Sequence, residues 1–208
     1  QKTILPMEDS EISAALKDSF VSSGIKVHNN SKVESIDKLK TKIKVNVTTE
    51  SQSLQIDGNV ALLAIGVEGN INNIGLQDIG VNSENGSISI NNYCQTNISN
   101  IYAIGDVAGP PWLAHKASAQ GHMVADLIGG VSSHEIDYFN VPNCTYCQPQ
   151  VASLGLTESK ARDLGHNIKV GKFFFRASGK AMAVGNTFGF VKLIFDDRYG
   201  ELIGAHII

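Results

Sequence analysis

One stretch of the sequence constrains the fold more than any other. An apolar run from Ile101 to Ile104 ends in Gly105-Asp106, and a proline-containing loop then leads to a helix that begins near Leu113. The run is typical of a strand buried on both faces of a parallel sheet, and such sheets bind ligands at the carboxyl ends of their strands. Glycine lets a ligand approach the backbone there, and the aspartate accepts hydrogen bonds from hydroxyl groups. The stretch therefore predicts an α/β protein with a ligand-binding loop.

The start of the following helix adds a second binding feature. The amides near Leu113 to His115 precede the first intrahelical bonds, so they carry partial positive charge and favour an anion or a polarised carbonyl. In a flavin this group is the N1–C2=O edge, which becomes negative on reduction. Gly-Asp alone fits any strand-end turn, but the strand end and the helix start would together suit one wall of a flavin site.

The same stretch resembles the second flavin-contacting segment of the pyridine-nucleotide disulfide oxidoreductases. Its helix start, Leu113-Ala114-His115-Lys116-Ala117, is similar to that of the dihydrolipoamide dehydrogenases, whereas glutathione and mercuric reductases resemble only the Gly-Asp part. The resemblance implies FAD and NAD as cofactors. It also implies that His115 contacts the flavin through its main chain, so no acid–base role is assigned to its imidazole. The flavin-contacting residues that it implies are Asp106, Trp112, Leu113, Ala114 and His115.

Composition excludes several classes of protein. The 208 residues are 42% hydrophobic and 18% charged, an ordinary globular balance, and the net charge of −3 does not favour nucleic-acid binding. No apolar run approaches the about 18 residues that span a bilayer, and no signal peptide opens the chain. Three cysteines argue against a disulfide-stapled secreted protein. We therefore expect a cytoplasmic protein that binds neither nucleic acid nor membrane.

Both ends of the sequence resemble cuts within a longer chain. Gln1 leads directly into an apolar run, and the strand-like pattern from Leu202 to Ile208 stops without a turn or polar tail. We expect an internal segment of a larger enzyme.

Residues 1–70 are predicted to form the second half of an NAD-binding domain. The resemblance carries over two NAD-contacting positions, Val33 beside the adenine and Gly66 at the end of the return strand. Taken alone, Val33 is typical of a strand core and Gly66 of a strand-to-loop turn. After Gly66 the family usually has Arg and a Pro-Asn pair, whereas Val67-Glu68-Gly69-Asn70 stands here. The expected elements are a helix capped by Asp9 or Ser10 and strands at 25–28, 32–36, 42–47, 53–56 and 60–66.

The remaining chain is predicted to contain two further parts. Residues 71–140 correspond to the returning segment of an FAD-binding domain, and residues 141–208 to the start of an α+β interface domain that forms a homodimer. The expected fold is thus a partial α/β flavoprotein with two dinucleotide-binding domains, followed by a partial dimerisation domain. In this last part we expect a helix from Glu158 to Leu164 and strands at 151–155, 168–175, 180–184, 190–195 and 201–208.

The pair Cys144 and Cys147 forms a C-x-x-C motif, which alone suggests a redox dithiol or half of a zinc site. Zinc requires four ligands, and no second motif of this kind occurs. A proline and a strand follow the motif, rather than the helix that activates a thioredoxin-like thiol. We interpret the two cysteines as structural.

The function implied by the resemblance is oxidation of protein-bound dihydrolipoyl groups, with lipoyl domains of 2-oxoacid dehydrogenase complexes as partners. The redox disulfide and the catalytic His-Pro…Glu motif are expected outside these residues, so no catalytic residue is assigned. Two alternatives remain: a glutathione- or mercury-reducing flavoprotein, and a non-catalytic binding protein built around the C-x-x-C motif.

Overall fold

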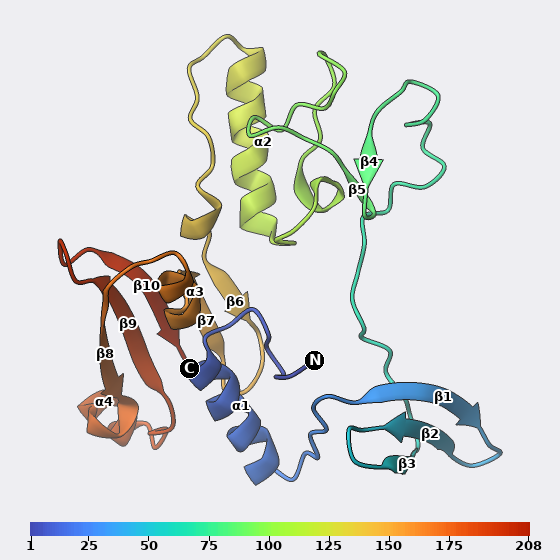
Figure 1. Cartoon of the computed structure of the whole chain (residues 1–208), viewed down its shortest axis with the longest axis vertical. Helices are drawn as coiled ribbons and strands as arrows, with labels where there is room; N and C mark the ends of the chain where they lie inside the picture. The colour runs from blue at the N-terminus through green and yellow to red at the C-terminus, as the bar shows by residue number, and fades with distance from the viewer. The chain divides into compact units, whose positions relative to one another are not determined.

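The computed structural model describes all residues from Gln1 to Ile208, which form two compact units (Figure 1). The first unit joins Gln1–Leu63 to Pro142–Ile208, and the second comprises Ala64–Val141. None of the helices combines the length and apolar character needed to cross a membrane.

The first unit opens with helix α1, Ser10–Ser22, where the sequence predicts it. Asp9 caps the helix, because its side chain accepts a hydrogen bond from the amide of Glu11 at 3.1 Å. The helix ends before Gly24, whose φ of +86° is the left-handed conformation common after helices. Ile12 and Leu16 lie one turn apart on the buried face. The cap and the apolar spacing therefore set both the start and the orientation of α1.

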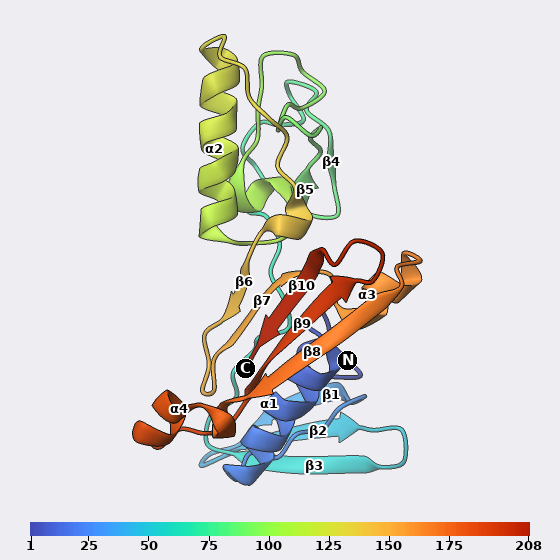
Figure 2. The same cartoon turned by 90° about the vertical axis from the view of Figure 1, so that its left-hand side faces the viewer.

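A five-stranded antiparallel sheet forms the centre of the first unit (Figure 2). Ile12 and Leu16 of α1 share a core with Val151, Phe190 and Ile208 from the sheet region. Helix α3, Glu158–Asp163, begins at Thr157, whose side chain accepts from the amide of Lys160. The strand order is β6 (Asn143–Thr145), β7 (Val151–Gly155), β10 (Leu202–Ile207), β9 (Phe190–Asp196) and β8 (Ile168–Phe174).

The predicted strand at 180–184 is wrong, because this segment is helix α4, Gly179–Ala183, preceded by the 3₁₀ turn η3, Phe175–Ala177. The Ser178 hydroxyl caps α4 by accepting from the amide of Ala181 at 3.5 Å. Alanine, lysine and methionine favour a helix over a strand, so local propensity explains the difference.

A second sheet in the first unit is a three-stranded meander of β1 (Lys32–Lys38), β2 (Ile43–Thr48) and β3 (Ser53–Gly58), as predicted. The predicted strand at 25–28 is wrong. The amide of Ile25 donates to the carbonyl of Phe20 at 2.9 Å, so the chain here completes the end of α1.

The second unit is built around helix α2, Ala114–Ile128, which ends at Gly129-Gly130 as predicted. A small core contains Val81, Ile88 and Ala103. The other elements are the hairpin of β4 (Ser83–Glu84) and β5 (Ser87–Ile88) and the 3₁₀ turns η1 (Gly105–Ala108) and η2 (Tyr138–Asn140).

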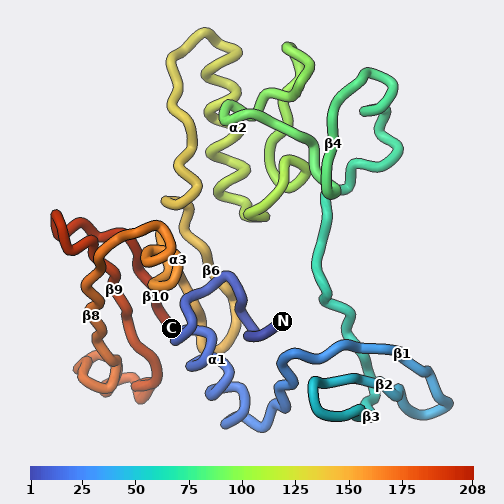
Figure 3. The backbone as a smooth tube through the Cα atoms, in the orientation of Figure 1, coloured from blue at the N-terminus to red at the C-terminus, as the bar shows by residue number.

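Two apolar runs that the sequence predicts as strands, 60–66 and 101–104, lack regular strand pairing. The first is an extended path in Figure 3, and Leu62 and Ile65 within it are 89% and 87% exposed. In the second, Tyr102 forms a single isolated bridge with Gln95. The run at 60–66 has no hydrogen-bonded strand neighbour, and the run at 101–104 is bonded only to the segment at 94–96, on one side. The apolar pattern therefore does not produce a strand here.

Candidate functional site

The loop at 105–109 adopts a conformation that requires glycine at its start. Gly105 has a φ of +74°, and an added Cβ would lie 3.4 Å from the Cβ of Ala117 in α2. Both the left-handed backbone and the close approach of the helix disfavour a side chain. Gly105 is buried whereas Asp106, the next residue, is exposed. The loop thus presents the Asp106 carboxylate to solvent from a backbone packed against α2.

The start of α2 lacks a side-chain cap. Leu113 is the N-cap without a side-chain hydrogen bond, and the first turn contains no acidic residue. Intrahelical bonding begins with the amide of Ala117, which donates to the carbonyl of Leu113 at 3.0 Å. Because no capping side chain of α2 neutralises it, this helix start favours an anion or a polarised carbonyl.

The five residues predicted to contact the flavin fall on the loop and on this helix start. Asp106, Trp112, Ala114 and His115 are exposed, and Leu113 is half-buried. The Asp106 carboxylate is an acceptor that suits the hydroxyls of a flavin's polyol chain. The polarised helix start suits the N1–C2=O edge, and the exposed indole of Trp112 suits the flavin ring system. The residues present therefore fit FAD.

The two positions predicted to contact NAD lie in different units. Val33 is on β1 of the first unit and is 55% exposed, so it is not the strand-core residue that its sequence context alone suggests. Gly66 belongs to the second unit, has a φ of +132° and has no heavy atom within 4 Å of an added Cβ. Both are open to a ligand, which is compatible with the predicted NAD contacts.

Sequence reasoning missed two buried polar residues behind the loop, Lys116 and Gln120, each with 1% exposure. With Met123 these residues follow at helical spacing and form the buried face of α2. That spacing was the available signal, because positions four and seven residues apart share one helix face.

The C-x-x-C motif does not form an activated thiol pair. Cys144 is exposed on the edge strand β6, whereas Cys147 packs against the core of the first unit and its thiol donates to the carbonyl of Pro149 at 3.0 Å. Burial raises the pKa of the Cys147 thiol, which disfavours the reactive thiolate. Among all described residues, no group of three or more His, Cys, Asp or Glu side chains is arranged to hold a metal ion.

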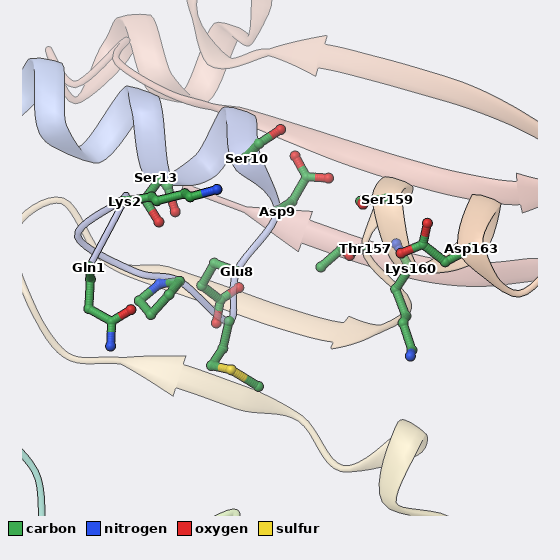
Figure 4. Close-up of a pocket in the computed structure, with 13 residues that line it drawn as sticks. Gln1, Lys2, Glu8, Asp9, Ser10, Ser13, Thr157, Ser159, Lys160 and Asp163 are labelled. Atoms are coloured by element: carbon green, nitrogen blue, oxygen red, sulfur yellow. Dashed lines mark hydrogen bonds between the residues drawn. The ribbon is translucent and has the colours of Figure 1, made fainter. Parts of the chain in front are cut away.

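The first unit contains a cavity of about 610 Å³ beside the start of α1. Figure 4 shows Gln1 and Lys2 on one side and Lys160 and Asp163 on the other. The Glu8 carboxylate in its wall already accepts hydrogen bonds from Asn143 at 2.7 Å and Ser153 at 3.1 Å. Both bonds go to Oε1 of Glu8, whereas its Oε2 is buried without a hydrogen-bond partner; Asp9, also in the wall, binds Lys192.

Comparisons with known proteins agree with this geometry. Residues 1–121 match the family described as pyridine nucleotide-disulphide oxidoreductase, and residues 141–208 match its dimerisation domain. These matches confirm the predicted α/β flavoprotein fold followed by an α+β dimerisation domain, and the family implies FAD and NAD as cofactors.

Two curated relatives are named dihydrolipoyl dehydrogenase. The Rhizobium etli protein is 46% identical over 99% of this chain and 43% of its own length, and the Zymomonas mobilis protein is 45% identical over 99% and 44%. The crystal structure of LpdA from Mycobacterium tuberculosis has a TM-score of 0.87 at 23% identity, covering 96% of this chain and 43% of that chain, a likeness that shows the fold. The chain therefore spans less than half the length of these relatives.

Proposed function

Because the chain belongs to the pyridine nucleotide-disulphide oxidoreductase family, we propose that it is part of a dihydrolipoyl dehydrogenase. Such an enzyme oxidises protein-bound dihydrolipoyl groups and passes the electrons through a disulfide and FAD to NAD. The observation that carries the proposal is 46% identity to a protein of that name over 99% of the chain. The helix start from Leu113 to Ala117 supports it, because glutathione- and mercury-reducing enzymes resemble the sequence only at Gly-Asp.

In this enzyme Asp106 would accept hydrogen bonds from polyol hydroxyls of the cofactor. The start of α2 at Leu113, Ala114 and His115, which lacks a side-chain cap, would stabilise negative charge on the flavin. Trp112 is 41% exposed and offers an apolar ring surface that excludes water beside the helix start. Bound FAD supplies two-electron transfer between the dithiol and NAD. The chain's own contribution is to hold and polarise that group.

The parts of the chain are assigned accordingly. Residues 1–70 supply the second half of the NAD-binding domain, with Val33 near the adenine and Gly66 near the dinucleotide. Residues 71–140 supply one wall of the FAD site, and residues 141–208 begin the dimerisation domain, through which we infer a homodimer. Lipoyl domains of 2-oxoacid dehydrogenase complexes are the proposed protein partners, in the cytoplasm.

The proposal is tested by steady-state kinetics on the purified full-length protein. NAD reduction is followed with dihydrolipoamide as the donor, and NADPH oxidation is followed with glutathione disulfide as the acceptor. We expect rapid NAD reduction and no reduction of glutathione disulfide. Turnover of glutathione disulfide with no dihydrolipoamide activity would contradict the assignment.

A further inference from the structure

Lys116 has an unusual environment for a charged side chain. It lies in the first turn of α2, is 1% exposed, and its Nζ donates to the carbonyl oxygens of Gly105 at 3.1 Å and Gly109 at 2.8 Å. These two carbonyls stand at the two ends of the turn that carries Asp106. The ammonium group of Lys116 therefore links the two ends of the turn that carries the exposed Asp106 carboxylate.

Gln120, one helical turn further along α2, holds the same loop from a second point. Its Oε1 accepts from the amide of Gly105 at 2.8 Å, and its Nε2 donates to the Tyr138 hydroxyl at 2.9 Å. Both the amide and the carbonyl of Gly105 are thus bonded to side chains of α2. The backbone before Asp106 has little freedom to rotate.

Burying an ammonium group costs free energy that an apolar side chain of similar length would not. Burial lowers the pKa of Lys116, and the charge of Asp106 opposes that shift. Neither of the two hydrogen-bond partners of Lys116 is a carboxylate. Packing alone therefore does not explain a lysine at this position. Its two hydrogen bonds explain it, because they fix the carbonyl groups of the turn that carries Asp106.

We propose that Lys116 is a positioning residue for the FAD site, which holds the 105–109 turn so that Asp106 is preorganised for the cofactor hydroxyls. The inference rests on the proposed function, because it names the group that sets the geometry of the same site. Charge-assisted hydrogen bonds from an ammonium group are stronger than those from a neutral amide. A neutral side chain in place of Lys116 therefore holds the 105–109 turn less rigidly.

The test is the dissociation constant of FAD for the full-length apoprotein, measured by fluorescence titration. Lys116→Gln removes the charge and is expected to weaken FAD binding about 10-fold, the effect of losing charge-assisted bonds. Lys116→Arg keeps the charge and several donors, and is expected to recover most of the affinity. Met123→Ala is the matched control, since it opens a cavity on the same buried face without removing a charged or amide side chain.

The inference is overturned if Lys116→Gln binds FAD as tightly as Met123→Ala, or if Lys116→Arg binds no better than Lys116→Gln. Should Lys116→Gln fail to fold, Gln120→Ala releases the same glycine from its amide side and is expected to weaken FAD binding several-fold relative to Met123→Ala. Unchanged affinity in Gln120→Ala would then overturn the inference. Failure of the proposed function is distinguishable, because it appears as wild-type protein that lacks dihydrolipoamide activity.

Discussion

The molecule has two buried lysines, one in each unit, and their charges are stabilised by different kinds of partner. Lys192 on β9 and Lys116 on α2 are both 1% exposed. The ammonium of Lys192 lies 2.8 to 2.9 Å from carboxylate oxygens of Asp9, Glu11 and Glu158. The ammonium of Lys116 has backbone carbonyls as its partners instead. The charge of Lys192 is neutralised by carboxylates, whereas the charge of Lys116 binds the backbone of a loop.

The pKa shifts of the two lysines follow from these partners. Burial is the largest single effect on both and lowers the pKa. At Lys192 the combined hydrogen bonds of Glu158, Glu11 and Asp9 outweigh burial and raise the pKa above its usual value. At Lys116 burial prevails and the pKa falls. From this comparison we expect that loss of Lys192 destabilises the first unit, whereas the proposed role of Lys116 is to hold a loop of the candidate FAD site.

The largest expected effect comes from breaking the Lys192 cluster. Lys192→Met leaves the carboxylate of Asp9 buried without its cation, so we expect a loss of about 3–5 kcal/mol in the free energy of unfolding of the first unit. Hydrogen exchange of the β9 and β10 amides in the full-length protein measures this loss. Lys169→Met is the control, because the Lys169–Asp197 pair is largely exposed and is worth about 0–1 kcal/mol. Equal protection in the two variants would show that the cluster does not stabilise the unit.

A pair of glycine substitutions sharpens the comparison of the two units. Gly105→Ala and Gly165→Ala both place a side chain at a left-handed φ, +74° and +84°, at a cost of about 1–2 kcal/mol each. Only Gly105 belongs to the loop that carries Asp106. We therefore expect weaker FAD binding in Gly105→Ala alone, measured by fluorescence titration. Equal FAD affinity in the two variants would show that the conformation of this loop does not affect FAD binding.

The smallest expected effect is the acid sensitivity of the Lys192 cluster. Hydrogen bonds from Lys192 and Arg162 lower the pKa of Glu158 below its ordinary value of 4.5. A lowered folded pKa stabilises the fold above the unfolded value, and this stabilisation disappears as the pH falls through the folded pKa. Hydrogen exchange of the β9 amides between about pH 6 and pH 3 should therefore show a loss of protection that Glu158→Gln reduces. An identical pH profile in Glu158→Gln would contradict this prediction, and exposed Glu50→Gln serves as the control.

Local signals were enough to predict helices α1 and α3 and four strands of the five-stranded sheet, β7 to β10, but not the edge strand β6 or helix α4. Asp9, Thr157 and the glycines after α1 and α3 fix helix ends through neighbouring backbone groups, so their effect is readable in sequence. The strands of that sheet pair with one another inside the chain. The runs at 60–66 and 101–104 have the same apolar character, yet a strand also depends on partners that its own sequence does not specify.

The candidate site was predictable only in part for a similar reason. Gly105, Asp106 and the start of α2 follow from a strand-end pattern and a family resemblance. Lys116 and Gln120 act on the backbone of a loop seven or more residues away, and their contacts become visible only once α2 packs against that loop.

The affinity of FAD for Asp106→Ala tests the central claim, that the Asp106 loop and the start of α2 form one wall of a flavin site. In the full-length apoprotein we predict a dissociation constant about 10- to 100-fold higher than in the wild type, because polyol hydroxyls lose a charged acceptor. As the control, Asp126→Ala removes an exposed carboxylate from α2 and should leave the dissociation constant unchanged. Equal FAD affinity in Asp106→Ala and Asp126→Ala would contradict the account.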